Sequence, residues 1–413
     1  MTQTVANNDA ATAGLDVAAD VVERARALRP LLEANATEAE RLRRLPDENI
    51  EAVREAGLFR LCTPRRLGGY ELPVHVRAKV YEELGAGCGA TGWVAAICNE
   101  NTWLGCLFGD EAQHEYFAAR PDPIVSVSFM PQSAARRVPG GLMIKGRFPF
   151  ASGSWHSDWT GLTVLNVDPR GNPVEGPEMV LSAFVPRSQY MVEETWDTVG
   201  MIGTGTHTIV IDREVFVPEH RLQPWAFLLE PFNAPGPTQH PDEVNYKTSG
   251  LTNGLMLAAP MLGEARAALE YVVDRSSLRG ITYSPYLKQC ESVTFQLQIG
   301  DAGMKIQTAE MHFRQALTDI EEFGNRGVRP DFATSSRIQA ECGYIAGQLR
   351  DALEVLMSAH GTASFSTSCP LQRYWRDVNT AGRHGFFNAG LCRESYGRSV
   401  LGQPTIGPLP EMP

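Results

Sequence analysis

The sequence contains no apolar run long enough to form a membrane-spanning helix. Such a helix needs about 20 consecutive apolar residues, and no stretch of the 413 residues approaches that length. Residues 1–16 also lack the basic start and apolar segment of a secretion signal. We therefore expect no membrane partner, and we interpret residues 1–16 as a disordered tail.

Paired cysteines and an excess of positive charge are missing as well. The eight cysteines form no CxxC pair, which favours reduced thiols in a cytoplasmic protein over a disulfide framework or a zinc site. The formal net charge is −11. The nearest basic cluster, Arg41, Arg43 and Arg44, is interrupted by leucines and is more typical of a solvated helix face. Nucleic acid is therefore not an expected partner.

The signature motifs of several enzyme classes are absent too. The chain has no GxSxG, no P-loop, no HExxH and no close set of histidines and cysteines at metal-ligand spacing. Neither hydrolase chemistry nor a metal site is therefore expected. Residues 87–92, GCGATG, match GxGxxG, but a helical pattern precedes them instead of the strand that a dinucleotide site needs. They predict a break between two helices.

What the sequence does contain is an ordered succession of helices, strands and helices. Val21, Ala25, Leu28 and Leu32 are spaced 4, 3 and 4 residues apart, which places them on one face of a helix. Helical signals continue to about residue 119. The first part of the chain is therefore predicted to be helical.

β-rich runs separated by turn residues begin near residue 121. Their short spacing leaves no room for crossover helices, which predicts an antiparallel sheet or barrel and disfavours a parallel Rossmann-type sheet. The runs cover residues 124–129, 141–150, 159–168, 178–186 and 207–218.

Helical periodicity returns after a Pro-rich loop that follows residue 220. Long helices are predicted over residues 292–323 and 335–358, and helices of this length usually pack as an antiparallel bundle. The predicted fold class is therefore α+β. We expect an N-terminal helical domain at 17–122, a middle β-barrel-like domain at 123–230, and a C-terminal four-helix bundle with a long entry loop at 231–413.

Several segments, in their order along the chain, resemble the acyl-CoA dehydrogenase superfamily. They are FRLCTPRRLGGY at 59–70, CGATGW at 88–93, SFMP at 128–131, KGRFPFASG at 145–153, and the segment from Val199 to Thr206. Each segment is weakly specific alone, but the ordered set covers about residues 17–400. The resemblance implies the fold of that superfamily.

Within the superfamily, the chain is similar to the flavin-dependent monooxygenase branch, which includes 4-hydroxyphenylacetate hydroxylase and dibenzothiophene monooxygenase. Dehydrogenases need a carboxylate base, whereas Arg376 and Asp377 are followed here by VNTAGRHGFFN, with no glutamate before Glu394. GSWHSDW at 153–159 also resembles the aromatic hydroxylases. The resemblance implies hydroxylation of a small aromatic or phenolic substrate by O2 and reduced flavin, through a flavin C4a-hydroperoxide.

The same resemblance implies the cofactor and the partners. The cofactor is reduced FMN or FAD, with FMNH2 slightly favoured, and a separate NAD(P)H-flavin reductase supplies it because the chain has no NAD(P)H motif. A cytoplasmic homotetramer is implied. Three alternatives stay open: an acyl-CoA dehydrogenase with a base near Glu264, an N- or S-oxygenase of the same fold, and a helical scaffold that has lost its flavin site.

The resemblance also assigns a flavin site. Ser152 and Gly153 end a predicted strand, where small residues let the backbone approach a planar ring and a hydroxyl can bind the flavin near N5. Ser128 and Phe129 would lie under the ring, and Arg275 resembles an arginine that relatives direct at flavin. The alternative for Ser152 and Gly153 is a plain turn, and for Arg275 a salt bridge at a helix end.

Catalysis and substrate binding are assigned in the same way. His384 stands where the monooxygenases carry a histidine, which can accept a phenol proton or hydrogen-bond the oxygenated flavin. The alternative for His384 is a histidine at a helix end that contacts backbone carbonyls. Similar phenol hydroxylases have a histidine where this chain has Asn101, and asparagine cannot act as a base at neutral pH. Asn101, Trp93 and Trp103 are predicted to line the substrate pocket, with core packing as the alternative for both tryptophans.

Overall fold

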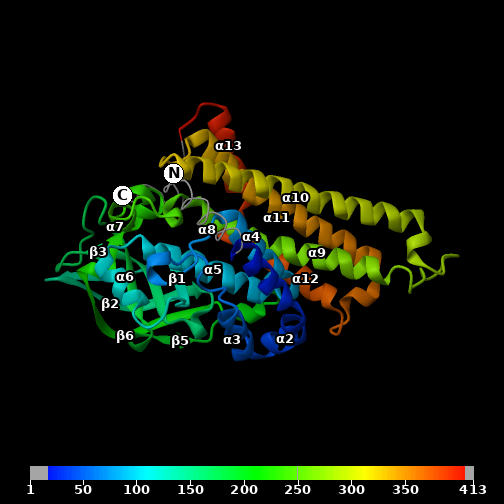
Figure 1. The fold of residues 1–413 in the computed structure, drawn as a ribbon, viewed down its shortest axis with the longest axis horizontal. Helices are drawn as coiled ribbons and strands as arrows, with labels where there is room; N and C mark the ends of the chain where they lie inside the picture. The colour runs from blue at the N-terminus through cyan, green and yellow to red at the C-terminus, as the bar shows by residue number, and fades with distance from the viewer. Residues whose placement is uncertain (1–16, 249, 405–413) are drawn as a thin grey trace, which may run out of the picture.

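The computed structural model describes residues 17–248 and 250–404, so the predicted tail at 1–16 lies outside the described residues. Figure 1 shows a β-sheet toward one end of the molecule and long helices that extend from it toward the other end. The helices in the described part of the chain are too short or too polar to span a bilayer.

The N-terminal helices form where the periodicity predicted them. Residues 17–27 are helical, and Val21, Ala25 and Leu32 are fully buried on the shared face. The helices that follow are α2 (Arg29–Leu42), α3 (Asp47–Glu55), α4 (Val74–Gly87), α5 (Gly89–Cys106) and α6 (Asp110–Phe117). The predicted break at the GxGxxG match is confirmed, because α4 ends at Gly87 and α5 begins at Gly89.

Helix α5 lies at the centre of the molecule. Every residue from Gly89 to Cys106 is buried, which is unusual because most helices keep one face in solvent. Neighbouring elements therefore surround α5, and it contacts both strand β1 and helix α9. Its side chains thus reach both the sheet and the helical bundle.

The middle of the chain forms one seven-stranded sheet in the order β5-β6-β2-β1-β3-β4-β7. The strands are β1 (Val125–Val138), β2 (Gly141–Ala151), β3 (Trp159–Val167), β4 (Val180–Pro186), β5 (Met191–Glu193), β6 (His207–Pro218) and β7 (Leu222–Pro224). All pairs are antiparallel except β1 and β3, which are parallel. The expectation of an antiparallel sheet is wrong for that pair.

The parallel pair has a simple topological cause. β2 returns antiparallel to β1 and ends beside the start of β1, and residues 152–158 then cross to the other side of β1. β3 therefore starts level with β1, with Val125 opposite Trp159. The short crossing places Ser152 and Gly153 at the sheet edge that faces the helices.

The C-terminal part is a helical bundle, and its two long helices match the prediction. The helices are α8 (Leu251–Met256), α9 (Ala258–Arg275), α10 (Val293–Asn325), α11 (Phe332–His360), α12 (Pro370–Ala381) and α13 (Ala389–Val400). Ser292 caps α10 by accepting a hydrogen bond from the amide of Phe295.

One hydrophobic core joins the N-terminal helices to the bundle, while the sheet has a core of its own. The contact between α4 and α9 is very close: a Cβ atom added to Gly85 would lie 2.4 Å from the carbonyl oxygen of Pro260. Only glycine permits this approach. The domain bounds at 122/123 and 230/231 stay a prediction.

Candidate active site

Ser152 lies directly after β2 and takes part in a buried chain of hydroxyl groups. Its Oγ is 2.8 Å from the Oγ1 of Thr206, which is 2.7 Å from the Oγ1 of Thr204. Thr204 donates to the carbonyl of Met201. Because Thr204 donates its only proton to Met201, Thr206 must donate to Thr204, and Ser152 must donate to Thr206. Ser152 is the member of this chain that lies next to the indole of Trp93.

The backbone on both sides of Ser152 adopts left-handed conformations. Gly153 has φ +70°, and a Cβ atom there would lie 3.2 Å from both Cys98 Sγ and Val94 Cγ1. Phe150 has φ +63°, which is rare for an aromatic residue, and 69% of its surface is exposed. A strained backbone with an exposed ring at a strand end is typical of a ligand site.

Trp93 connects Ser152 to His384. The indole Nε1 of Trp93 donates toward Ser152 Oγ over 3.4 Å, and its ring is edge-on to the imidazole of His384, with ring centres 5.6 Å apart. Ser152 belongs to the sheet, Trp93 to α5 and His384 to the turn after α12. Three segments distant in sequence therefore meet here.

His384 is half-buried, and desolvation by the segments around its imidazole sets its protonation state. Desolvation lowers its pKa to about 4, so the imidazole is neutral near pH 7. The backbone amide of Phe386 donates to its Nδ1 over 3.4 Å, which favours the tautomer that carries its proton on Nε2. In that state His384 offers an N–H donor rather than a strong base.

Asn101 lies two turns along α5 from Trp93. Its Nδ2 donates to the carbonyl of Val125 at the start of β1 over 2.9 Å. Its Oδ1 is buried and has no hydrogen-bond partner among the described residues. A buried acceptor of this kind costs free energy unless a donor reaches it, so Asn101 is suited to a ligand that carries an O–H or N–H group.

A buried ion pair holds the same part of α5 in place. The guanidinium Nη1 of Arg77 lies 2.7 Å from the carboxylate of Glu100, and the hydroxyl of Tyr81 donates to that carboxylate over 3.1 Å. Burial raises the pKa of Glu100, while Arg77 acts in the opposite direction. Because Glu100 precedes Asn101, this network fixes the turn of α5 from which Asn101 projects.

Ser128 and Phe129 lie on β1, on opposite faces of the strand. Ser128 Oγ donates to the carbonyl of Pro149 over 2.8 Å, so it ties β1 to the segment that leads to Ser152. The ring of Phe129 is 6.4 Å from that of Phe386, which is itself 5.3 Å from the imidazole of His384. Both β1 residues thus lie next to the group around His384.

Trp103 and Arg275 lie apart from this group. The indole of Trp103 is buried and donates to the carbonyl of Asn245 over 2.8 Å, which is a core contact. The guanidinium of Arg275 stacks on Tyr271, 3.6 Å from the ring centre. Arg275 ends α9, about 27 Å from its other end at 1.5 Å per residue, and Figure 1 shows α9 leading away from the sheet.

Sequence reasoning did not select Phe150, Thr206 or Phe386, which the structure places around Ser152 and His384. Phe150 and Thr206 lie inside segments that carried the family resemblance, and Phe386 lies two residues after His384. Their positions near Ser152 and His384 in the sequence could therefore have identified them. The exposure of their side chains and the conformation of their backbone could not be predicted from the sequence.

The residues around Ser152 fit a planar ring such as flavin. The exposed ring of Phe150 offers a face for stacking, and the absence of a side chain at Gly153 lets the turn after β2 pack closely against Val94 and Cys98 of α5. Because the Ser152 proton is directed at Thr206, the Ser152 oxygen can accept a hydrogen bond from a ring N–H. The site therefore offers an aromatic face and a polar group that a flavin ring can contact.

Comparisons with known proteins agree with this geometry. The family model "Acyl-CoA dehydrogenase, N-terminal domain" matches residues 21–120, and "Acyl-CoA dehydrogenase, C-terminal domain" matches residues 255–389. These matches cover the two helical parts that enclose the site.

Individual relatives indicate to which branch of the superfamily the chain is most similar. The chain is 32% identical to the oxygenase component of an FADH2-dependent resorcinol hydroxylase from Rhizobium sp., with 92% of this chain and 94% of that protein covered. It is 28% identical to the oxygenase subunit HsaA of a flavin-dependent monooxygenase from Rhodococcus jostii, with 93% and 98% covered. The solved structure of XiaF from Streptomyces sp., in complex with FADH2 and glycerol, superposes with a TM-score of 0.90 at 34% identity and covers 97% of this chain and 99% of XiaF. The chain therefore belongs to the acyl-CoA dehydrogenase superfamily, among the oxygenase components of flavin-dependent monooxygenases.

Proposed function

We propose that this protein hydroxylates a small aromatic or phenolic substrate, using O2 and reduced flavin that a separate reductase supplies. The convergence of Ser152, Trp93 and His384 beside an exposed Phe150 carries the proposal. When bound, reduced flavin supplies the two electrons with which one oxygen atom of O2 is transferred and the other leaves as water. The protein's own part is to position the reactants and to exclude water.

Ser152 and its neighbours would orient the flavin ring. The hydroxyl chain from Ser152 through Thr206 and Thr204 to the carbonyl of Met201 directs the Ser152 proton at Thr206, so the Ser152 oxygen is already oriented to accept from an N–H of the ring. Phe150 would cover one face of the ring, and Gly153 lets the turn that carries Ser152 pack against α5. The buried ring of Trp93 and the ring of Phe386, which is 39% exposed, would limit access of water.

His384 would act as a hydrogen-bond donor to oxygen rather than as a strong base. Its pKa of about 4 keeps it neutral, and Nδ1 already accepts from Phe386. A phenol releases its proton only near pH 10, so a base with a pKa of 4 would gain little of it. The Nε2–H group can instead bind the substrate oxygen or the oxygen that is transferred.

The substrate would carry a donor group that reaches Asn101. The unpartnered Oδ1 of Asn101 accepts a phenolic O–H or an indole N–H equally well, and it cannot remove the proton. Its position two turns from Trp93 on α5 would align the substrate ring with that helix. This supports neutral aromatic substrates.

Reduced FAD is the first flavin to test. The Rhizobium hydroxylase and XiaF, at 32% and 34% identity, are both named with FADH2, which supports FADH2 over the FMNH2 that the sequence slightly favoured. We propose a cytoplasmic location because the eight cysteines are all free among the described residues.

We also propose that the chain assembles as a homotetramer. Four apolar residues form an exposed stripe on one face of α10, namely Val293, Leu297, Met304 and Met311, each more than 60% exposed. Such a stripe is costly in water and is typical of helix-helix association. In an assembly, Arg275 of one chain could approach the flavin of another, whereas within one chain it lies at the far end of α9.

The decisive experiment supplies chemically reduced FAD to the purified protein and then adds O2 with resorcinol or a related phenol. We expect a hydroxylated product that carries oxygen from 18O2. Tightly bound oxidised flavin together with acyl-CoA oxidation would identify a dehydrogenase instead. Failure to bind flavin in either redox state would indicate a scaffold without a flavin site.

A further inference from the structure

Asp377 of α12 is buried against the loop that leads from β5 to β6. It is 3% exposed, and its Oδ1 accepts a hydrogen bond from the backbone amide of Met201 in that loop. The two residues are 176 positions apart in the chain, so only the packing of α12 against the sheet brings them together. The carboxyl has no role in the hydroxylation proposed above.

The residue before Asp377 holds the same loop. The guanidinium of Arg376 donates to the carbonyl of Val199, and a Cβ atom added to Gly200 would lie 2.1 Å from the carbonyl oxygen of Arg376. The backbone of the loop therefore lies directly against the backbone of α12. Two side-chain hydrogen bonds and one close backbone contact thus fix the loop on this helix.

Met201 adopts a left-handed backbone conformation. Its φ is +53°, which is rare for a residue with a side chain. Its carbonyl accepts from the indole Nε1 of Trp196 over 2.9 Å and from Thr204 Oγ1 over 2.8 Å. Such a backbone persists only where its surroundings hold it, and the Asp377 carboxyl holds its amide. Without that acceptor, Met201 would be free to relax and to turn its carbonyl away from Thr204.

The hydroxyl chain of Thr204, Thr206 and Ser152 begins at this carbonyl. Thr204 gives its proton to Met201, which leaves Thr206 to donate to Thr204. Ser152 in turn donates to Thr206. Every donor in the hydroxyl chain therefore points toward the loop that α12 holds, and Ser152 can only accept from a ligand.

Reduced and oxidised flavin differ at the ring nitrogen N5. Oxidised flavin has a lone pair there and accepts a hydrogen bond, whereas reduced flavin carries an N–H and donates one. An oxygen that can only accept therefore binds the reduced ring better. The direction of the hydroxyl chain thus decides which redox state of the cofactor Ser152 favours.

We propose that Asp377 is a positioning residue that makes the site select reduced over oxidised flavin, because it holds Met201 and so keeps Ser152 an acceptor. Asp377 acts through the loop and the hydroxyl chain. His384 lies in the turn after the same helix, so α12 supports both sides of the site. The inference rests on the proposed hydroxylase function and deepens it by naming the residue that sets the redox preference.

The test measures the affinities of the protein for reduced and for oxidised FAD by anaerobic calorimetry. We expect the wild type to bind reduced FAD more tightly. Asp377→Leu removes the acceptor and should lower the ratio of reduced to oxidised affinity about two- to tenfold, the scale of one neutral hydrogen bond. Asp377→Asn keeps an oxygen that accepts from the Met201 amide and should keep the wild-type ratio.

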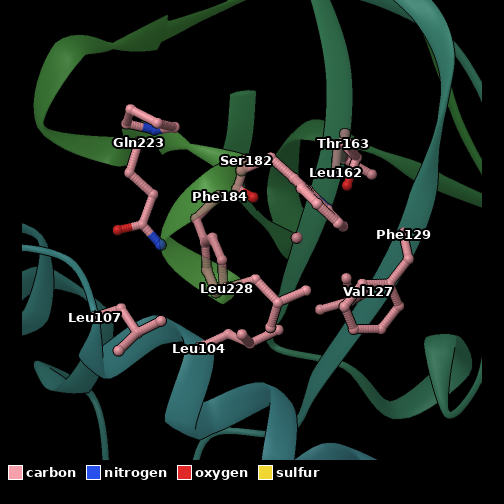
Figure 2. Close-up of a pocket in the computed structure, with 13 residues that line it drawn as sticks. Leu104, Leu107, Val127, Phe129, Leu162, Thr163, Ser182, Phe184, Gln223 and Leu228 are labelled. Carbon is pink, nitrogen blue, oxygen red and sulfur yellow. The ribbon is translucent and has the colours of Figure 1, made fainter. Parts of the chain in front are cut away.

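Thr204→Val interrupts the hydroxyl chain closer to Ser152 and leaves α12 unchanged. It should lower the ratio to the same extent, which keeps the inference testable if Asp377→Leu does not fold. Thr163→Val is the matched control. Thr163 is a buried threonine of the same sheet that borders the pocket shown in Figure 2, and neither Ser152 nor Thr204 borders that pocket. The control should keep the wild-type ratio.

A double variant tests whether Asp377 acts through Ser152. In a Ser152→Ala background, Asp377→Leu should leave the ratio unchanged, because the hydroxyl through which Asp377 acts is gone. A further fall in that background, or a wild-type ratio in Asp377→Leu or Thr204→Val, would overturn the inference. A wild type that binds FAD in neither redox state would overturn the proposed function instead, so the two failures are distinguishable.

Discussion

The indole of Trp93 stands edge-on to the imidazole of His384, with ring centres 5.6 Å apart and planes inclined by 68°. The same indole directs its N–H toward Ser152. One buried residue of α5 thus sets the distance between the residue assigned to the flavin and the residue assigned to oxygen transfer. Changes at any of the three should therefore affect coupling more than folding.

Replacing His384 distinguishes a hydrogen-bond donor from a base. Glutamine keeps an N–H donor but cannot act as a base, so for His384→Gln we expect the product formed per reduced flavin to fall at most about two- to tenfold, the effect of one weakened neutral hydrogen bond. Hydrogen peroxide should rise by the same amount, measured beside product by chromatography. A loss of roughly 10²–10⁴-fold would indicate general base catalysis instead. His312→Gln, on the bundle surface, is the control and should stay coupled.

His384 also predicts a pH dependence of stability. Histidine in an unfolded chain titrates near 6.5, whereas the pKa of His384 in the folded chain is about 4. The unfolded state binds this proton more readily, so the contribution is fully present above pH 6.5 and is lost as the pH falls toward 4.

In urea titrations across this window, His384→Gln should lose less stability on acidification than the wild type. Comparing both proteins at each pH removes the contribution of other groups, such as Asp377, whose pKa burial raises to about 6. Parallel curves for the two proteins would contradict the low pKa of His384.

The left-handed backbone of Gly153 predicts that a substitution at this position disturbs the flavin site locally. Gly153→Ala should destabilise the chain by about 1–2 kcal/mol for the left-handed backbone, and its Cβ would also press on Cys98 and Val94. We expect flavin binding, measured by fluorescence, to weaken as Ser152 shifts. Gly171→Ala is the matched control, because Gly171 has φ +88° and no atom within 4 Å of the added Cβ. It should show the backbone cost alone, with normal flavin binding.

The buried ion pair of Arg77 and Glu100, next to Asn101, predicts a large loss of stability when its cation is removed. Arg77→Met leaves the carboxyl of Glu100 buried without its cation, which should lower the free energy of unfolding by about 3–5 kcal/mol. The double variant Arg77→Met with Glu100→Gln should recover part of this loss, as urea unfolding can measure. Arg136→Met breaks an exposed pair with Glu214 and should cost at most about 1 kcal/mol. Equal costs for the two arginines would contradict the proposed network.

Periodicity and turn residues were sufficient for most of the architecture. The helix face of Val21 and Ala25, the break after Gly87 and the two long helices α10 and α11 follow from local patterns, because each depends on residues within a few turns. The parallel pairing of β1 and β3 could not be predicted in this way. It depends on which side of β1 the chain takes after Ser152, a choice made by packing against the helices.

The candidate site also has features that follow from local sequence patterns and features that depend on tertiary packing. The sequence by itself determined that Ser152 and Gly153 end a strand, because strand and turn signals are local. Only the tertiary structure decided that Trp93 connects Ser152 to His384. It decided that Trp103 binds a core carbonyl and that Arg275 lies at the far end of α9. It also decided the low pKa of His384, since desolvation depends on the segments that surround the imidazole and not on its neighbours in the chain.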